Sequence, residues 1–388
     1  MKIIVACSGG PDSMALLDME RREGHEIVIC HVNYKKRKSA DRDEKYVNTY
    51  CQKYDIPVYT LYPVYPGDEN FQAWARDVRY DFFEETARKE NVKHIYIAHQ
   101  KDDVIETYFF QKQRNMLCDT YGLMSVSSRK EFTLVRPLLK YEKKDLEAYC
   151  QSHLIPYGVD ESNLSNDYTR NQIRHSQIDF MTSSEKDEWM EKIERENQAW
   201  AKKREQCKKN IQQKGMVPLL NEEEAWLYLD LYLDLPYHLS KKHLYALVEQ
   251  LKRPCLIDLK THWLERHLDQ ILVEEKTESK EYVFNSIEEM KKFPFFQDFG
   301  KTIEGMYLQE DDFPVLLRNA RDADEITLRF GNKKVHRFFV DRKIPRIHRM
   351  RWCVVENAAK EIVFVPGIGC DVAHFSYQPN VFMLQLWV

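Results

Sequence analysis

The stretch Cys7-Ser8-Gly9-Gly10-Pro11-Asp12-Ser13 decides the fold of the N-terminal part of this chain. It follows the apolar run Ile3-Ile4-Val5-Ala6, whose short length and β-branched side chains predict a buried parallel strand. The run Met14-Ala15-Leu16-Leu17 after it begins a helical pattern. The sequence therefore predicts a strand, a tight glycine turn and the N-terminus of a helix, in that order.

A turn of this kind is suited to binding phosphate. It directs backbone N–H groups and the positive end of a helix dipole toward one point. Ser8 and Ser13 add hydroxyl donors, and the carboxylate of Asp12 can hold Mg²⁺. The spacing differs from that of a Walker loop, because no lysine follows Gly10 at the required place. An ordinary glycine turn between a strand and a helix is the alternative.

Length and composition indicate a reduced, soluble protein of two or three domains. The chain has 388 residues, 31% of them charged, and a mean hydropathy of −0.62. No apolar run approaches the ~20 residues of a membrane span, and we expect no secretory signal. None of the nine cysteines forms a C-x-x-C pair, so we expect a cytoplasmic protein with free thiols and no membrane partner.

The first part of the chain alternates between predicted strands and helices. Strands are expected at 2–7, 26–32, 58–61 and 94–98, and helices at 39–54, 70–89 and 102–113. This order is typical of a parallel sheet covered by helices on both sides. Ligands bind such sheets beyond the carboxyl ends of the strands, where the glycine turn, His31 and His99 all fall.

Two arginines on the predicted helix 70–89 are candidates for binding a triphosphate. Arg76 and Arg79 are three residues apart, so they share one helix face. Guanidinium groups can bind phosphate oxygens through two parallel hydrogen bonds. The alternative is a solvated basic face that pairs with Asp77 or Asp81.

A second cluster of charged residues begins where strand 94–98 passes into a helix. Asp102, Asp103 and Glu106 follow His99 and share the first turns of that helix. Acidic side chains there can simply complement the helix dipole, and a histidine with two aspartates is also compatible with a metal site. A group of carboxylates would equally suit an ammonium group, and could take a proton from an amine.

The unit Ser8-Gly9-Gly10-x-Asp12-Ser13 resembles the pyrophosphate loop of the PP-loop ATP pyrophosphatases, which split ATP between its α and β phosphates. Within that superfamily, the whole chain resembles the tRNA(Ile)-lysidine synthetases. Further motifs that carry this resemblance are His99-x-x-Asp102-Asp103-x-x-Glu106-Thr107, Arg136-Pro137-Leu138-Leu139, Asp160-x-Ser162-Asn163 and Arg170-Asn171-x-Ile173-Arg174. The resemblance is strong over 1–174, good over 325–370 and weak between them.

The resemblance implies a fold of several parts. An α/β PP-loop domain with a parallel sheet, of the adenine nucleotide α-hydrolase type, is expected at 1–181, and a connecting helix at 182–214. A mainly helical middle domain is expected at 215–309, and a small α+β domain at 310–388. The apolar pattern of residues 222–272 further predicts a helical core there.

The resemblance also implies an activity. ATP adenylates O2 of the wobble cytidine in the CAU anticodon of isoleucine tRNA, and the ε-amine of free lysine then displaces AMP. Asp103 and Glu106 are expected to bind lysine, and Asp12 to bind Mg²⁺; with Arg76 these three form the expected catalytic set. Arg79 is expected to support Arg76, and Asp102 to position its helix. The residues expected to bind ATP are Ser8, Gly9, Gly10, Pro11, Asp12, Ser13, His31 and Arg76.

RNA must be bound by local patches, because the net charge of the chain is −4. Residues 329–351 carry nine Lys and Arg against one acid, a net charge of +8, which is typical of a surface that follows a phosphate backbone. Solvated surface charge is the alternative. The residues expected to bind tRNA are Arg170, Arg174, Lys333, Lys334, Arg337, Arg342 and Lys343.

Residues 111–124 depart from the family, whose glycine-rich run is reduced here to Gly122-Leu123. We expect a loop of different shape, and its contacts with cytidine stay open. Two other functions also stay open. A tRNA thiolation enzyme would need a thiol pair or an iron–sulfur cluster, and the cysteines offer no local pair. A non-catalytic tRNA-binding protein would not need the intact residues Ser8, Asp12, Ser13, Asp103 and Glu106.

Overall fold

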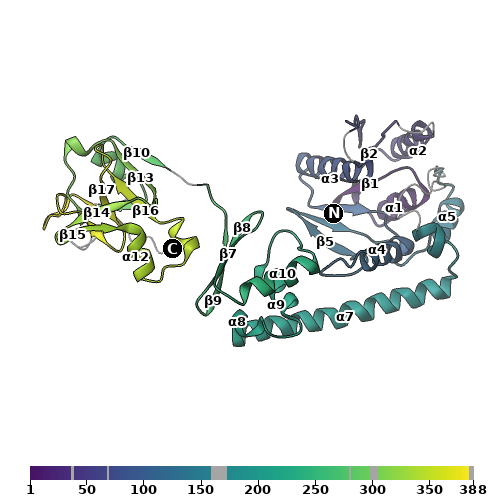
Figure 1. The fold of residues 1–388 in the computed structure, drawn as a ribbon. Coiled ribbons are helices and arrows are strands. Elements are labelled where there is room, and N and C mark those ends of the chain that lie inside the picture. Colours follow the sequence, from purple (N-terminus) through teal and green to yellow (C-terminus); the bar gives the residue numbers. More distant parts are fainter. Residues whose placement is uncertain (36–38, 68–69, 159–172, 279–280, 298–304, 384–388) are drawn as a thin grey trace. The chain divides into compact units, whose positions relative to one another are not determined.

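The computed structural model describes residues 1–35, 39–67, 70–158, 173–278, 281–297 and 305–383. The chain forms two compact units (Figure 1). The first comprises Met1–Gln206 with Tyr237–Lys241, and the second comprises Cys207–Pro236 with Lys242–Val388. Within the described ranges, no helix is both long and apolar enough to span a membrane.

The first unit is built on a six-stranded sheet in the order β3-β2-β1-β4-β6-β5. The parallel strands are β1 (Lys2–Ala6), β2 (Glu26–Val32), β3 (Val58–Leu61), β4 (His94–Ile97) and β6 (Phe132–Val135). The edge strand β5 (Val126–Arg129) is antiparallel to β6. The predicted parallel α/β fold is confirmed, and the carboxyl ends of the five parallel strands lie along one edge.

Helices cover both faces of this sheet because the central strand β1 is apolar on both sides. Ile3 and Val5 pack with α1 (Pro11–Arg22), α2 (Ala40–Lys53) and α5 (Lys143–Ser152). Ile4 faces the other way and packs with α3 (Phe71–Lys89). All three side chains are fully buried. This alternation explains why a continuous apolar run forms a strand between two layers of helices.

A third apolar cluster attaches two further segments to the first unit. Val104 and Tyr108 of α4 (Lys101–Gln113) pack against Ile178 of the short helical segment η2 (Arg174–Ile178). Ile193 of α7 joins the same cluster. The helix α7 (Ser183–Lys214) has the bounds that its lack of glycine and proline predicts.

The second unit begins with the short helices α8 (Met216–Leu219), α9 (Ala225–Leu233) and α10 (Lys241–Leu251). The prediction of helix as far as residue 272 is wrong. Residues 255–275 instead form the antiparallel strands β7 (Cys255–Asp258), β8 (His262–His267) and β9 (Gln270–Glu275). Pro254 ends the helical pattern, and Leu268 takes a left-handed φ of 49° in the β8–β9 turn, which a helix cannot accommodate.

The rest of the second unit is the expected α+β part. Its main sheet has the order β10-β13-β16-β17-β18, from strands Tyr282–Phe284, Val315–Asn319, Cys353–Glu356, Ile362–Val365 and Gly369–Cys370. A small sheet joins β11 (Phe296–Gln297), β19 (Val381–Met383) and β12 (Gly305–Met306), and β14 (Glu325–Leu328) pairs with β15 (Gly331–Lys334). The helices are α11 (Ile287–Lys291), α12 (Val335–Asp341) and α13 (Arg346–Arg349), with the turn η4 (Glu310–Asp312). The domain boundaries at 181, 214 and 309 stay predictions.

Candidate active site

The glycine turn after β1 is organised around the hydroxyl of Ser13. Its Oγ accepts hydrogen bonds from the backbone N–H of Ser8 at 3.2 Å and of Gly9 at 3.1 Å, and donates one to the Gly10 carbonyl at 3.0 Å. Pro11 begins α1, where its missing N–H is no loss. The turn thus directs two amide donors at one oxygen atom, and a phosphate oxygen has the chemistry to take that place.

Gly9 is required by the shape of this turn. Its φ is +88°, and a Cβ there would lie 2.7 Å from the backbone oxygen of Asp43 on α2. Both observations exclude a side chain. The backbone carbonyl of Gly9 also accepts a hydrogen bond from the N–H of Gly158 at 2.8 Å. The conformation is therefore set by a close approach of three backbone segments.

Asp12 has the features of a carboxylate that binds a cation. Its Oδ1 is buried and has no hydrogen-bond partner in the described part of the chain. Burial, and then the nearby charge of Asp103, raise the pKa of Asp12 to about 7. The described residues contain no group of three or more His, Cys, Asp or Glu placed to hold a metal. Mg²⁺ commonly binds one or two carboxylates together with phosphate oxygens, so the residue present fits that ion in company with a nucleotide.

His31 ends β2 beside the same turn. Its Nδ1 lies 2.8 Å from the carbonyl oxygen of Cys7, so Nδ1 carries the proton and donates it. The Nε2 atom is buried and has no hydrogen-bond partner among the described residues. In that tautomer Nε2 accepts a hydrogen bond, so His31 offers a ligand one acceptor at the sheet edge.

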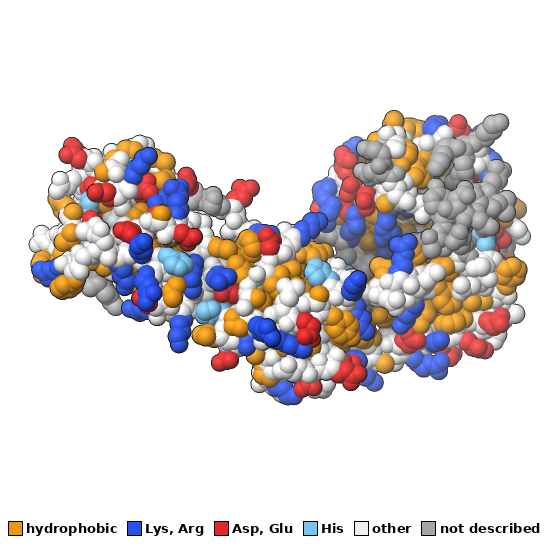
Figure 2. Space-filling model, in the orientation of Figure 1, with side chains coloured by type: hydrophobic (Ala, Val, Ile, Leu, Met, Phe, Trp, Pro, Cys, Tyr) orange, Lys and Arg blue, Asp and Glu red, His pale blue; other side chains and the backbone are white. Residues whose placement is uncertain are grey.

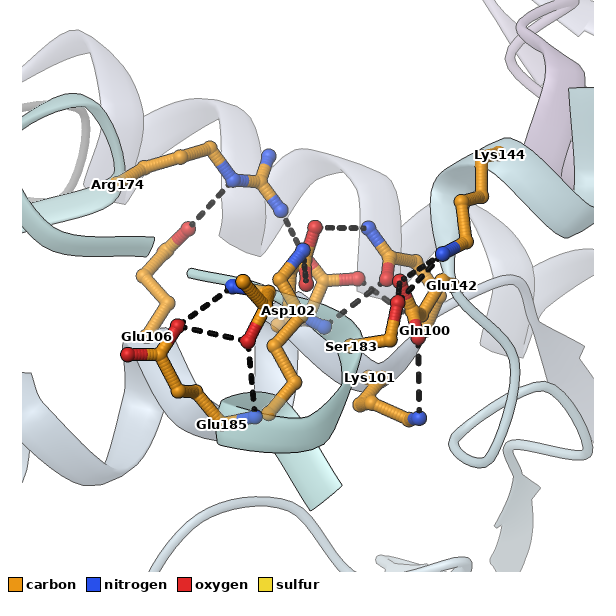
Figure 3. Close-up of polar contacts among 12 residues, drawn as sticks. Gln100, Lys101, Asp102, Glu106, Glu142, Lys144, Arg174, Ser183 and Glu185 are labelled. Atoms are coloured by element: carbon orange, nitrogen blue, oxygen red, sulfur yellow. Dashed lines mark hydrogen bonds and ion pairs between the residues drawn. The ribbon is translucent and has the colours of Figure 1, made fainter. Parts of the chain in front are cut away.

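Asp103 and Glu106, the two carboxylates expected to bind lysine, both contact the side chain of an arginine. Arg174 Nη2 lies 2.9 Å from Asp103 Oδ1, and Arg174 Nε lies 3.5 Å from Glu106 Oε2. In Figure 3 a dashed line joins the guanidinium of Arg174 to the carboxylate of Glu106. The other oxygen of Asp103 accepts the backbone N–H of Gln100 at 2.8 Å and caps α4. The pair is therefore both a helix cap and a cation site.

Asp102 faces away from that pair. Its Oδ1 lies 2.7 Å from Nζ of Lys186 on α7. The neighbouring Lys101 pairs with Asp187 of α7 at 2.6 Å. It also pairs with Glu142, which precedes α5, at 3.5 Å (Figure 3). These ion pairs, of which only Asp187 has an exposed side chain, fix the start of α4 against α5 and α7, in keeping with the positioning role expected for Asp102.

A basic group flanks the acidic one. Arg136 donates from Nε to His99 Nδ1 at 3.2 Å, and from Nη1 to the carbonyl of Met124 at 2.8 Å. Burial, and then Arg136, Arg76 and Arg79, lower the pKa of His99 to about 4, against the opposing effect of Asp103. His99 is thus neutral at pH 7, and it lies between the arginines and the acidic pair.

The structure brings several of the predicted residues together. Asp103 and Arg174 both influence the pKa of Asp12, and Arg76 influences that of His99. One sheet edge therefore carries the phosphate turn, the acidic pair and the arginines of α3. Arg170 lies outside the described residues, and the predicted tRNA contacts of α12 and its neighbours belong to the second unit.

The basic stretch 329–351 divides into two parts. Arg351 pairs with Glu274 of β9, and Arg349 Nε donates to the Ile344 carbonyl at 2.7 Å. Glu265 of β8 accepts the backbone N–H groups of Arg346 and Ile347, each at 2.9 Å. These contacts attach α13 to the β7–β9 sheet. Arg349 and Arg351 therefore already have partners within the protein.

The residues before α13 are the more accessible ones. Lys334 pairs with Glu325 at 3.6 Å and Arg337 with Asp341 at 3.1 Å, all four with exposed side chains. Lys333 and Arg342 lie over the ring of Phe338, at 5.4 and 5.8 Å from its centroid. Figure 2 shows Lys and Arg side chains spread over the surface of this unit among acidic ones.

The segment that departs from the family is attached to α7. Asn197 accepts the N–H of Tyr121 at 2.8 Å and donates to its carbonyl at 2.9 Å. Trp200 Nε1 donates to the carbonyl of Cys118 at 3.0 Å, and the Gln111 side chain accepts the N–H of Gly122 at 2.7 Å. Polar side chains thus hold this loop in place of the missing glycines.

Sequence reasoning missed the contacts that three residues make at this site. His99 and Arg136 both stand in recognised motifs, which was a usable signal, but their contact joins residues 37 positions apart. Lys186 gave no signal, because it is one of many charged residues in α7. Its pairing with Asp102 depends on how α7 packs on α4.

Comparison with known proteins shows what this chain is similar to. Residues 1–181 match the PP-loop domain family. A tRNA(Ile)-lysidine synthase from Ureaplasma parvum is 41% identical over 45% of this chain and 53% of its own length. One from Mycoplasma mycoides is 28% identical over 93% of this chain and 96% of its own length.

Among solved structures, a U34-tRNA thiolase from Methanococcus maripaludis aligns over 51% of this chain and 72% of its own, with 14% identity and a TM-score of 0.44. The two lysidine synthases match this chain differently. The match to the Ureaplasma protein is confined to part of the chain, and the match to the Mycoplasma protein extends over nearly all of it. Residues 1–181 are a PP-loop domain, and the chain is similar to tRNA(Ile)-lysidine synthases over nearly its whole length.

Proposed function

We propose that this protein joins free lysine to C2 of the wobble cytidine in the CAU anticodon of isoleucine tRNA, at the expense of ATP. O2 of the cytidine attacks the α-phosphorus, and the bond between the α-phosphorus and the bridging oxygen breaks to release pyrophosphate. The ε-nitrogen of lysine then attacks C2, AMP leaves with the former O2, and the nitrogen loses its proton. The products are lysidine, AMP and pyrophosphate.

The turn after β1 binds the phosphates in the first step. The amide groups that bind the Ser13 hydroxyl bind a phosphate oxygen in its place. Arg76, supported by Arg79, contacts the phosphates from α3. Mg²⁺, when bound with the phosphates, would offset the charge that develops on the leaving pyrophosphate, and Asp12 is the carboxylate placed to hold it. His31 contributes its free acceptor nitrogen to binding the nucleotide.

The acidic pair serves the second step. The amine of lysine is protonated near pH 7, and it must lose that proton before it can attack C2. Asp103 and Glu106 stand one helical turn apart and already hold a cationic side chain, so they can hold an ammonium group and then accept its proton. The neutral His99 keeps its Nε2–H available as a donor beside them.

One observation carries the proposal. The carboxylate of Asp12 and that of Asp103 follow different strands, β1 and β4, yet they lie close enough for Asp103 to raise the pKa of Asp12. A nucleotide at the turn and an amine at the acidic pair would therefore share one reaction centre. Relatives that align over nearly the whole chain carry the name of this activity.

The second unit holds the tRNA in this proposal. Lys333, Lys334, Arg337, Arg342 and Lys343 present exposed or half-exposed cations near one another in the chain. Cations of this kind bind RNA through its phosphates, independently of sequence. The anticodon then reaches the sheet edge of the first unit.

The decisive experiment is incubation of the protein with an isoleucine tRNA transcript that has a CAU anticodon, together with ATP, Mg²⁺ and radiolabelled lysine. The expected result is label in the tRNA and release of AMP and pyrophosphate in equal amounts. A matched transcript with a changed wobble base takes up no label. Folded protein that leaves the first transcript unlabelled would exclude the activity.

The thiolation alternative has no support from the cysteines. All nine are free thiols, five of them buried. The same incubation with a sulfur donor in place of lysine, followed by mass analysis of the nucleosides, would detect a thiolated product. Pyrophosphate exchange with ATP that depends on tRNA excludes a protein that only binds RNA.

A further inference from the structure

An arginine of this chain occupies the position where the proposed function, on which this inference rests, puts the ammonium group of lysine. Arg174 touches both carboxylates of the pair, Asp103 at 2.9 Å and Glu106 at 3.5 Å (Figure 3). All three side chains are largely shielded, with between 12% and 23% of their surface exposed. The amine and the guanidinium therefore need the same oxygen atoms.

The pairing is strong enough to hold the guanidinium in a shielded place. Burial disfavours its charge, but Asp103 and Glu106 outweigh that effect and raise the pKa of Arg174 above its usual value. Arg174 thus stays charged, and a second cation beside it would be repelled. Lysine gains full access to both carboxylates only when the guanidinium moves away.

The phosphate site offers the guanidinium another partner. Strands β1 and β4 are neighbours with Ala6 opposite Ile97, so the phosphate turn and the start of α4, where Asp103 holds Arg174, lie at the same edge of the sheet. Arginine binds phosphate oxygens through two parallel hydrogen bonds, and a triphosphate brings far more negative charge than two carboxylates. A nucleotide at the turn therefore competes with Asp103 and Glu106 for the guanidinium.

The backbone that carries Arg174 does not need to move. Ile173 directly precedes the segment η2, and Ile178 is its last residue. Both are buried in the apolar cluster with Val104 and Ile105 of α4. A flexible side chain on an anchored segment can exchange partners by rotating about its own bonds. The exchange therefore needs no unfolding of α4 or of η2.

We propose that Arg174 couples the two small substrates, so that ATP binds first. Without nucleotide, the guanidinium neutralises Asp103 and Glu106 and keeps amines out. With nucleotide, it turns to the phosphates and leaves both carboxylates free for lysine. This assigns Arg174 a positioning role between the two sites in place of the tRNA contact expected from the sequence.

The test measures lysine binding by equilibrium dialysis, with and without α,β-methylene-ATP and Mg²⁺. This analogue cannot be split between its α and β phosphorus atoms. In the unmodified protein, the analogue should tighten lysine binding by about tenfold or more. In Arg174→Gln, lysine should bind more tightly than to the unmodified protein without nucleotide, and the analogue should change its affinity by less than about twofold. Arg174→Lys, which keeps a cation, should retain part of the coupling.

Lys112→Gln is the matched control, because Lys112 lies farther along the same helix as Asp103 and pairs with Glu196 of α7 at 2.8 Å, so the variant leaves Arg174 paired with Asp103. It should keep the full coupling, and thermal melting checks that each variant is folded. The inference fails if the analogue leaves the lysine affinity of the unmodified protein unchanged, or if Arg174→Gln binds lysine more weakly without nucleotide. If such a protein still lysylates tRNA, only the coupling is wrong. If lysine neither binds nor enters tRNA, the proposed function is wrong as well.

Discussion

Arg136 Nε donates a hydrogen bond to His99 Nδ1 across 3.2 Å, and this contact determines which ring nitrogen of His99 keeps its proton. Because Nδ1 accepts, Nε2 is the donor in the neutral ring. Arg136 is only 7% exposed and also holds the Met124 carbonyl and the Ser127 hydroxyl. One guanidinium therefore orients the histidine of the acidic motif and fixes the start of β5.

Replacing Arg136 by alanine should weaken both functions of this contact. Three acceptors would lose a donor, and we expect a loss of about 2 kcal/mol in the free energy of unfolding. The rate of tRNA-dependent exchange between ATP and pyrophosphate should fall by about tenfold or more. Arg129→Ala is the control, since Arg129, at the end of β5, binds Glu84 of α3 and not His99. Equal losses of exchange in the two variants would contradict a role for the His99 contact.

Gly9→Ala should destabilise the phosphate turn more than its backbone angle alone explains. Gly24 supplies the comparison, because its φ of +79° is similar but a Cβ there meets nothing within 4 Å. Gly24→Ala should lower the free energy of unfolding by about 1 kcal/mol, and Gly9→Ala by about 3 kcal/mol or more. Urea unfolding measures both, and only Gly9→Ala should also abolish nucleotide binding. Similar losses at the two sites would show that the approach of Asp43 is easily relieved.

Asp12→Asn should make the protein more stable and inactive. The folded pKa of Asp12, about 7, lies above its unfolded value, so the folded state binds the extra proton between about pH 4 and 7. Stability contributed by this group therefore falls as the pH rises through that window. The variant should lose that part of the slope and gain stability at pH 7.5, while adenylation stops. Urea midpoints between pH 4.5 and 7.5 test this, and an unchanged slope would contradict it.

His374 should make the second unit more stable in acid than in base. Asp371 at 2.6 Å, and then Asp312 at 2.8 Å, raise the pKa of His374 to about 9. The stabilisation is complete below the unfolded value of about 6.5 and is lost as the pH rises through 9. His374→Asn should remove this dependence. Hydrogen exchange of the peptide around Asp371, at pH 6.5 and 9, measures it. Exposed His153 on the other unit, replaced by asparagine, should leave that exchange unchanged.

In the second unit, exposed cations and cations that already pair with an acidic residue should affect tRNA binding differently. Lys343→Glu should weaken binding and lower the dependence on salt by about one phosphate contact. Arg351→Glu, at a residue already paired with Glu274, should alter the salt dependence less. Filter binding at several salt concentrations compares them. A larger effect at Arg351 would move the RNA surface toward α13.

Local sequence was sufficient wherever a structure depends on neighbours in the chain. The strand-turn-helix unit around Gly9 and Ser13, the helix that begins near Asn70 and the buried strand around Ile4 could all be predicted in this way. Asn70, for example, accepts hydrogen bonds from the N–H groups of Gln72 and Ala73 as its position predicts. Each feature joins residues only a few positions apart.

Pairings across the fold could not be predicted in the same way. Asp103 and Arg174 are 71 positions apart, and both belong to motifs, yet nothing in either motif names the other as its partner. Strands β7 and β8 lie within residues 222–272, which the apolar pattern predicts as helix, because apolar residues in a short window fit both periods. Leucine rarely takes a left-handed conformation, so Leu268 does not indicate a turn. The sequence therefore does not predict the hairpin of β8 and β9.

The hydroxyl of Ser13 has a consequence for selectivity. Since it already occupies the amides of Ser8 and Gly9, an incoming group gains only the difference between its own hydrogen bonds and those it displaces. A neutral oxygen gains almost nothing from this exchange, whereas a charged one gains appreciably. The phosphate turn of the ligand-free protein therefore selects against alcohols and water. It can bind an anion without a change in the conformation of its backbone.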